Sequence, residues 1–258
     1  MLLDEDWICD ENLFIDTSYV KTIWNCFDES ALEMMLKLSD LSEGFDVFYK
    51  LQALTIGNNK CESFLKTLYA LGYDKAVRID YNDDTRFKPE FIAGLITKYV
   101  NKKNDVDMIV MGRQTSDGSN EKTPLLTAEY LHWSCITQVI NIEPVDEKSI
   151  KVTSQCDEGI LTQIVSTPCV LSIGNVANSY LRVPTLKDRM KLGKKPIEVI
   201  TPYEIGMTEC EDFGSLVELC AMENLNKNRE CVMIEGNSPK EKAEYLYENY
   251  LKERLKRL

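Results

Sequence analysis

Apolar residues near the start of the chain alternate between strand-like runs and helix-like spacing. Residues 45–56 are rich in apolar side chains and end at a Gly57-Asn58-Asn59 turn, which predicts a buried strand. From Cys61 the apolar positions keep helical spacing as far as Gly72, a residue type typical of a helix C-terminus. Residues 76–79 then resume as a strand. The pattern predicts a strand, a helix and a second strand in succession.

A second helix and a third strand extend this alternation. Pro89 suits the first turn of a helix, and a polar break separates that helix from a strand over 106–111. Upstream, Ser30 and Glu33 match a capping box and predict a helix over 31–38. Strands that alternate with helices of about 10 to 15 residues imply right-handed crossovers and a parallel sheet covered on both faces. The fold class is therefore α/β.

The pattern changes to closely spaced strands in the middle of the chain. Residues 136–140, 150–153 and 160–165 predict strands, the last two around a turn at 157–159. This spacing indicates an antiparallel excursion. The predicted architecture is a parallel α/β sheet with an antiparallel hairpin beside it.

The C-terminal part has weak periodicity until Ser238-Pro239 opens a charged helix over 240–258. No repeat, low-complexity tract or long linker separates independent modules. We therefore expect one domain over residues 1–201 and a C-terminal extension over 202–258 that packs on this domain or on a partner.

Composition narrows the class of protein. The 258 residues are 44% hydrophobic and 28% charged, as in a soluble globular protein, and no run of about 18 apolar residues predicts insertion into a membrane. The start, Met1 to Asp6, is acidic where a secretory signal is basic, so we expect a cytoplasmic protein. Nine cysteines include no Cys-x-x-Cys pair for a metal, and we expect them to be reduced and mostly buried. A net charge of -12 disfavours nucleic acid, so the expected partners are proteins and small molecules.

A polar loop between a predicted strand and an apolar helix carries the main candidate chemistry. It runs over residues 112–124, and ligands of open α/β sheets bind at the carboxyl ends of strands. We expect Thr123 to cap the following helix and Pro124 to open it, so that free N–H groups there can hold a phosphate. Arg113 and Lys122 add positive charge, and short polar side chains can bind ribose or phosphate oxygens. The alternative is a polar connecting loop with a capped helix.

Signatures of other nucleotide sites and of catalytic sites are missing from the sequence. Neither Gly-x-Gly-x-x-Gly nor Gly-Lys-Ser/Thr occurs. His132 is the only histidine and has no evident nucleophile partner, and the 42 carboxylates are too scattered to nominate an acid–base pair. An adenylyl-transfer enzyme would need a Ser-Gly-Gly-x-Asp-Ser or His-x-Gly-His run, which is absent. We therefore expect no catalytic side chain and no enzyme activity of the chain's own.

Several segments together resemble the beta subunit of electron transfer flavoproteins (ETF beta), in order and spacing, over about residues 20–206. The loop Gly112-x-Gln114-x-x-Asp117-Gly118 to Thr123 is similar to the family's nucleotide loop, with Lys122 in place of its usual glutamine. Asn25-x-Phe27-Asp28 resembles the family's Asn-Pro-Phe-Asp turn, with Cys26 in place of proline. The hairpin over 152–172 follows the family signature at Asp157, Gly159, Thr162, Pro168 and Val170.

A basic run near the end of the main domain resembles the family's recognition loop. Residues 182–195 hold six basic residues and one acid in an otherwise acidic chain, which suggests docking, although such residues are also commonly just solvated. The resemblance implies that Leu186 anchors a dehydrogenase partner. The implied docking residues are Arg182, Pro184, Leu186, Lys187 and Lys191.

The resemblance implies a Rossmann-like, three-layer domain over residues 1–201 that binds an adenine nucleotide. This nucleotide would be AMP, or a second FAD in electron-bifurcating members. An alpha subunit would carry FAD between the subunits, the extension would wrap it, and a flavin dehydrogenase of the acyl-CoA dehydrogenase type would donate electrons. The implied nucleotide-binding residues are Asn25, Cys26, Phe27, Asp28, Ile56, Gln114, Thr115, Ser116, Asp117, Gly118, Ser119, Asn120, Glu121, Lys122, Thr123, Pro124, Leu125 and Leu126.

The beginning of the chain departs from the family pattern. Members normally open with an apolar central strand ending in Lys-Gln-Val-Pro-Asp, whereas here only Met1 to Leu3 precede an acidic stretch. Either the start is truncated or this member lacks that strand. The departure favours an alternative function, a stand-alone nucleotide-binding regulatory protein without an alpha subunit.

Overall fold

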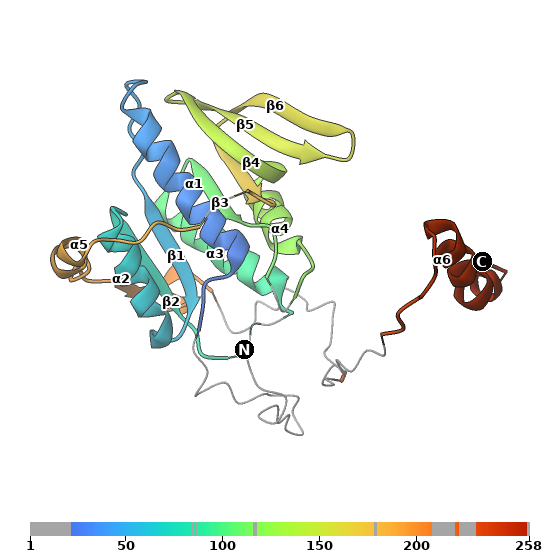
Figure 1. The fold of residues 1–258 in the computed structure, drawn as a ribbon. Helices are drawn as coiled ribbons and strands as arrows, with labels where there is room; N and C mark the ends of the chain where they lie inside the picture. Colours follow the sequence, from blue (N-terminus) through green and yellow to red (C-terminus); the bar gives the residue numbers. More distant parts are fainter. Residues whose placement is uncertain are drawn as a thin grey trace. The chain divides into compact units, whose positions relative to one another are not determined.

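The computed structural model describes residues 22–83, 85, 87–115, 118–177, 180–207, 220–221 and 231–256. The chain divides into a large compact unit, residues 21–219, and a second unit that includes residues 220–258. The large unit holds two sheets with helices on their faces (Figure 1). The opening strand of the family would precede residue 22 and lies outside the residues that are described.

The first sheet is parallel and has the strand order β1-β2-β8. Its strands are β1 (Gln52–Gly57), β2 (Lys75–Asp80) and β8 (Glu198–Ile200). Helix α2 (Glu62–Ala70) connects β1 to β2, and α3 (Pro89–Lys103) follows β2. Gly72 has a φ of 106° and ends the turn after α2, because L-residues with a side chain rarely adopt this conformation. The predicted strand–helix–strand succession and the helix start at Pro89 are confirmed.

The second sheet is mixed and has the order β3-β7-β4-β5-β6. It contains β3 (Met108–Gly112), β4 (Ser134–Asp146), β5 (Ser149–Cys156), β6 (Gly159–Ser166) and β7 (Cys169–Ile173). Strands β4, β5 and β6 are antiparallel, which confirms the predicted excursion. Strand β7 returns between β3 and β4, parallel to both, and all five of its residues are buried.

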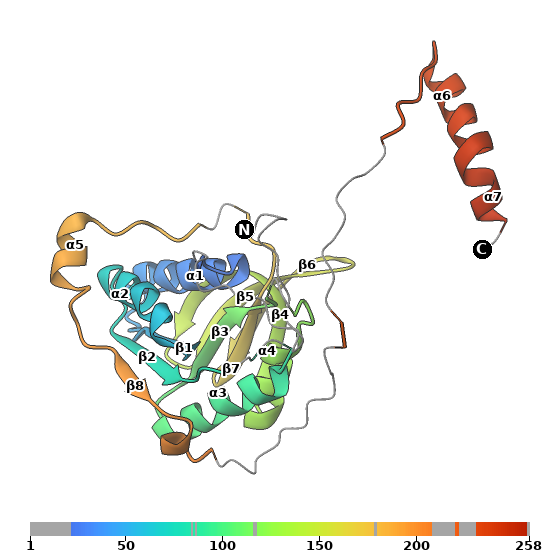
Figure 2. The same cartoon turned by 90° about the horizontal axis from the view of Figure 1, so that it is seen from below.

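Helices cover both faces of the sheets. Figure 2 shows α1 (Cys26–Ser42) and α2 on one face, and α3 with α4 (Lys122–Leu131) on the other. Met34 and Leu38 of α1 pack on β4 and β7, whereas Leu36 packs beside β1. On the other face, Leu95 and Tyr99 of α3 belong to one apolar cluster that includes residues of both sheets. Helices α1 and α3 therefore hold the two sheets together. The α/β fold class with helices on both faces is confirmed.

The start of α1 differs from the prediction. The helix begins at Cys26 with Asn25 as its N-cap residue, five residues before Ser30 of the expected capping box. The Ser30 hydroxyl instead donates to the Cys26 carbonyl inside the helix at 3.0 Å. The Glu33 carboxylate accepts from Arg182 rather than from the helix start. The capping-box prediction was wrong because tertiary contacts of the first turn extend the helix toward its N-terminus.

Two other expectations need correction. The strand predicted over 45–56 begins at Gln52, and Leu51 just before it bonds to the side chain of Asp74. The cysteines that the structure describes are free, but Cys169 is the only one of these seven that is fully buried. Three of the others, Cys26, Cys61 and Cys156, lie at helix or hairpin ends, where packing is incomplete.

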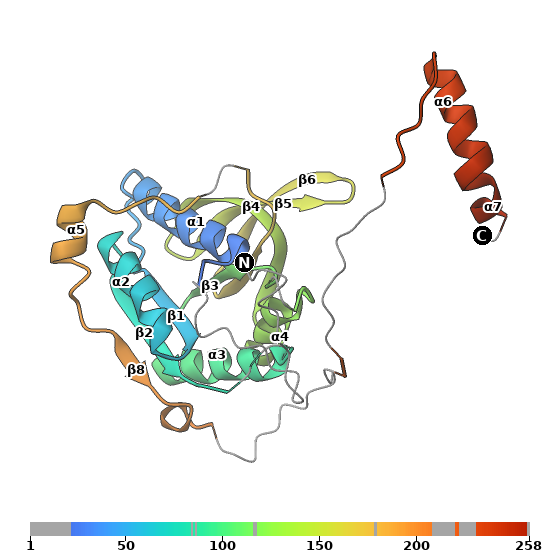
Figure 3. The same ribbon diagram turned by 60° about the horizontal axis from the view of Figure 1, so that its bottom comes forward.

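The chain packs on the main unit beyond residue 201. A 3₁₀ turn, Tyr203–Ile205, buries Ile205, and the Lys98 amine donates to the Gly206 carbonyl at 2.9 Å. Figure 3 shows α5 (Leu186–Lys191) beside α2, at the outer part of the first sheet.

The second unit contains the predicted charged helix. It comprises α6 (Pro239–Leu246), a π-helical turn, Tyr247–Leu251, and α7 (Lys252–Leu255). Ser238 caps it by accepting a hydrogen bond from the Glu241 amide. None of its described residues is buried. Among the helices of the described part, none has the length and apolar character needed to span a bilayer.

Candidate functional site

The carboxyl end of β3 meets the start of α1. The Gly112 amide donates to the Asp28 carboxylate at 2.8 Å. A Cβ atom at Gly112 would lie only 2.7 Å from the Asp28 nitrogen and from the Phe27 Cβ atom. Glycine therefore permits the close approach of α1 to the loop that follows β3, which is the predicted nucleotide loop.

Asn25 joins the same helix start to this loop. Its amide nitrogen donates to the Gln114 carbonyl at 2.8 Å and to the second oxygen of Asp28 at 2.7 Å. Its side-chain oxygen Oδ1 is buried and accepts no hydrogen bond from the described residues. A buried acceptor of this kind needs a donor, such as a ligand hydroxyl or a water. The structure thus brings Asn25 and Asp28 next to Gln114, although Asn25 and Gln114 are 89 residues apart in the sequence.

Arg113 is engaged inside the protein. Its guanidinium lies over the Phe27 ring, 4.9 Å from the ring centroid, and donates to the Gln138 amide oxygen at 3.0 Å. It also forms an ion pair with Glu121 at 3.3 Å. The sequence did not indicate these contacts, because Phe27, Gln138 and Glu121 come from separate segments. Arg113 therefore stabilises the loop, and much of its charge is balanced by Glu121.

The loop between Gln114 and α4 forms a tight local network. The Thr115 hydroxyl accepts from the Gly118 amide at 3.1 Å, and the Thr115 carbonyl accepts from both the amide and the hydroxyl of Ser119. Ser119 and Glu121 have positive φ values of 45° and 57°. Ser116 and Asp117, two of the residues expected to bind the nucleotide, lie outside the residues that the structure describes.

The start of α4 lies two residues earlier than expected. The helix begins at Lys122, and the Asn120 side chain accepts from the Lys122 amide at 3.1 Å. Thr123 is therefore inside the first turn and is not the N-cap, so that prediction was wrong. The local reason is the left-handed conformation of Glu121, which turns the chain before Lys122. Because the Lys122 N–H is bound by Asn120 and Pro124 has no N–H, helix geometry leaves the Thr123 N–H as the first-turn donor without an intrahelical partner.

An ion pair brings the starts of α3 and α4 together. The Lys122 amine lies 3.8 Å from the carboxylate of Glu90, whose side chain is only 9% exposed. Glu90 follows β2 and Lys122 follows β3, so the carboxyl ends of these strands lie at one edge. Pro124 is buried, Leu125 is exposed and Leu126 is half-buried. A cation and a helix N-terminus at a strand edge are the groups that bind phosphate in α/β folds.

Two further residues expected to bind the nucleotide, Cys26 and Ile56, lie on different elements. Cys26 is exposed at the first position of α1. Ile56 is near the end of β1, in the other sheet, where it packs on the apolar cluster around Leu95. No described hydrogen bond links Ile56 to the loop, and its role in a pocket remains a prediction.

The predicted docking residues divide into exposed and engaged groups. Leu186 is 74% exposed and begins α5, while Lys187 and Lys191 are also exposed on this short helix. Pro184 is buried. Arg182 is held by carboxylates of α1, which sequence spacing could not reveal.

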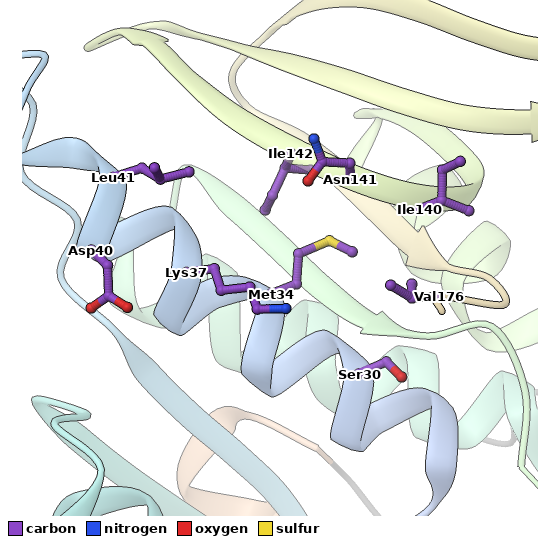
Figure 4. Close-up of a pocket in the computed structure, with 9 residues that line it drawn as sticks. All are labelled: Ser30, Met34, Lys37, Asp40, Leu41, Ile140, Asn141, Ile142 and Val176. Carbon is purple, nitrogen blue, oxygen red and sulfur yellow. The ribbon is translucent and has the colours of Figure 1, made fainter. Parts of the chain in front are cut away.

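A separate pocket of about 320 Å³ lies between α1 and β4 (Figure 4). Its walls are largely apolar, with the single cation Lys37 and the single acid Asp40 at its rim. It contains none of the residues expected to bind a nucleotide. The lining residues are Ser30, Met34, Lys37, Asp40, Leu41, Ile140, Asn141, Ile142 and Val176.

These features define an α/β protein whose polar loop is fixed at the carboxyl edge of a strand, beside the starts of three helices. The chain belongs to the electron transfer flavoprotein domain family, whose model matches residues 12–205. It is 29% identical to the putative electron transfer flavoprotein subunit YgcR of Escherichia coli K12, over 93% of this chain and 87% of that protein.

Two further relatives carry the name electron transfer flavoprotein subunit beta. The Methylophilus methylotrophus protein is 26% identical over 95% of this chain and 92% of its own length. The human protein is 27% identical over 85% of this chain and 82% of its own length. The resemblance to the beta subunits predicted from the sequence motifs is confirmed.

Proposed function

We propose that the chain is the beta subunit of a heterodimeric electron transfer flavoprotein and binds an adenine nucleotide at the loop between β3 and α4. The observation that carries this proposal is the convergence of Asn25, Asp28 and Gln114 at the carboxyl end of β3. The family membership supports the same function. A polar loop that only connected two elements would not need two long-range hydrogen bonds to a second helix.

The residues at this edge fit an adenine nucleotide. The first turn of α4 and the Lys122 amine would hold phosphate oxygens, because both present positive potential. The buried side-chain oxygen of Asn25 would accept a hydrogen bond from a ribose hydroxyl or from the adenine amino group. Glu90 limits the net positive charge at Lys122, which suits a single phosphate such as that of AMP better than a triphosphate.

In electron transfer this chain would bind and orient the nucleotide and the protein partners. FAD held with an alpha subunit, or bound at this loop in place of AMP, would supply the redox chemistry. This chain would orient the nucleotide and present the exposed surface of α5 to a flavin dehydrogenase of the acyl-CoA dehydrogenase type. The amphipathic helix over 239–255 would contact the alpha subunit, because its apolar side chains remain exposed in the described part.

The test is to co-express the chain with the flavoprotein subunit encoded beside it and purify the complex. Released nucleotides are then identified and a flavin spectrum is recorded. One FAD with one AMP per heterodimer would support an ordinary electron carrier, and two FAD a bifurcating one. Absence of both a complex and flavin would refute the proposal and favour a stand-alone nucleotide-binding protein.

A further inference from the structure

The segment that precedes α5 is fastened to α1 chiefly by Arg182, beside a hydrogen bond from the Leu181 amide to the Glu29 carboxylate at 3.3 Å. The Arg182 guanidinium donates to Glu33 through Nη2 at 2.9 Å and through Nε at 3.1 Å. The Arg182 backbone amide donates to the other oxygen of Glu33 at 3.0 Å. Its Nη1 atom donates to Asp40 at 2.8 Å. Both carboxylates come from α1, 149 and 142 residues earlier in the chain.

The two carboxylates differ in burial. The Glu33 side chain is 6% exposed, whereas that of Asp40 is 61% exposed. A buried carboxylate is costly unless it is paired and hydrogen-bonded, so Glu33 depends on Arg182 for compensation. The pKa of the neighbouring Tyr73 phenol is raised by burial and further by the Glu33 charge. Arg182 therefore has a structural partner that a docking protein would have to displace at a high cost.

The other end of the segment is fastened to α2. The Tyr69 hydroxyl donates to the Pro196 carbonyl at 2.9 Å, and the Lys195 amine lies over the Tyr69 ring, 5.4 Å from its centroid. Gly193 approaches backbone oxygens of Arg189 and of Lys66. Residues 183–191 therefore form a span that is held at both ends.

The span itself presents apolar and positively charged groups. Val183, Leu186 and Met190 are 82%, 74% and 61% exposed. Lys187 and Lys191 are exposed and form no ion pair among the described residues. Thr185 caps α5 by accepting from the Asp188 amide, which fixes the start of the helix. This surface fits a protein that offers an apolar pocket rimmed by carboxylates.

We propose that Arg182 is a positioning residue: by binding Glu33 and Asp40 it holds residues 183–191 in the orientation that the dehydrogenase binds, and it does not itself contact that partner. The proposal rests on the proposed function, because the dehydrogenase is the partner of that function. Arg182 thus supports the docking surface from behind and is not part of it. Leu186, Lys187 and Lys191 remain as docking groups.

The experiment compares the full-length protein, in complex with its alpha subunit, with three variants of the support and one control. Arg182→Gln and Glu33→Gln each remove one side of the buried pair, and Glu33→Gln keeps the side-chain volume. Asp40→Asn changes only the exposed carboxylate, so this variant is expected to fold even if the buried ones do not. Lys187→Gln removes one positive charge from the same segment, as Arg182→Gln does, but leaves the support intact.

The first readout is amide hydrogen exchange over residues 183–191. We expect exchange roughly tenfold faster in Arg182→Gln and Glu33→Gln, because the local opening loses a charge-assisted hydrogen-bond pair. Asp40→Asn should give a smaller increase, and Lys187→Gln none. Unchanged exchange in Arg182→Gln and in Asp40→Asn would overturn the positioning role.

The second readout is the KM for a flavin dehydrogenase, with kcat and nucleotide content measured beside it. We expect Arg182→Gln and Glu33→Gln to raise the KM alike, by roughly tenfold. A variant that combines these two changes should be no worse than either single one. A KM raised by Arg182→Gln but not by Glu33→Gln would mean direct docking and would overturn the proposal. If no dehydrogenase reduces even the unmodified complex, the proposed function is wrong, while hydrogen exchange still decides whether Arg182 holds the span.

Discussion

The carboxylate of Asp28 accepts a hydrogen bond from the Gly112 amide at 2.8 Å, so the first turn of α1 is joined to the last residue of β3. The same helix binds Arg182 through Glu33, five residues beyond Asp28. At 1.5 Å of rise per residue, five residues correspond to about 7.5 Å along the axis. One rigid helix therefore supports both the proposed nucleotide loop and the proposed docking surface.

Gly112→Ala should destabilise the protein. The added Cβ atom would lie 2.7 Å from the Asp28 nitrogen, and backbone at both sites would have to shift. We expect a loss of roughly 1–3 kcal/mol in the free energy of unfolding, measured by urea denaturation. Gly44→Ala is the control, since its nearest neighbour would be 3.8 Å away. Equal stability of Gly112→Ala and the unmodified protein would contradict the close approach.

Asn25→Ala should lower the content of bound adenine nucleotide. The change removes the donor to the Gln114 carbonyl and the buried acceptor, so the loop loses its link to α1. A loss of about 1 kcal/mol corresponds to roughly fivefold weaker binding, measured as nucleotide released from the purified complex. Asn141→Ala is the matched control, because Asn141 donates to Glu143 at 3.0 Å from an exposed position of β4. Unchanged nucleotide content in Asn25→Ala would place the site elsewhere.

Leu186→Ala should slow electron transfer from the dehydrogenase without changing nucleotide content. Leu186 is 74% exposed, so its truncation removes docking surface and leaves no cavity in the core. We expect a rise in KM of roughly 5- to 30-fold, the effect of an interface residue worth about 1–2 kcal/mol. The control is Phe48→Ala, a similarly exposed apolar side chain outside the docking segment. Equal KM values for the unmodified protein and Leu186→Ala would remove Leu186 from the interface.

Glu198 should make stability depend on acid pH. Hydrogen bonding to Lys75 is the main cause that lowers the pKa of this carboxyl below its ordinary value of 4.5, with Lys103 adding to the effect. Because the pKa of Glu198 is lower in the folded state, its ionised form stabilises the protein above about pH 4.5. This stabilisation is lost as the pH falls through the folded-state pKa.

The measurement is urea unfolding of the unmodified protein and of Glu198→Gln between about pH 7 and about pH 3.5. The stability difference between the two should be largest near neutral pH and shrink in acid. Glu244→Gln serves as control, because Glu244 belongs to an exposed pair with Lys240 at 3.9 Å. A difference that does not change with pH would show that the Glu198 charge has no role.

Local signals in the sequence predicted much of the fold. Pro89 begins α3, Gly72 ends the turn after α2, and Gly159 lies in the hairpin turn between β5 and β6. These features depend on the backbone preferences of one residue and on the periodicity of its neighbours, so they can be recognised without tertiary contacts. The family motifs around Asn25, Gln114 and Leu186 indicated in the same way the segments for which nucleotide binding and docking are proposed.

Contacts between distant residues decided the rest. Asp28 and Gly112 extend α1 past the apparent capping box at Ser30, and the turn at Glu121 starts α4 before Thr123. The sequence predicted Arg182 as a docking residue on the surface, whereas the fold pairs it with Glu33 of α1. The sequence by itself determined which segments form helices, strands and polar loops, because these follow from short-range preferences. Only the tertiary structure decided where α1 begins and which charges are engaged, because burial pairs groups that lie far apart in the chain.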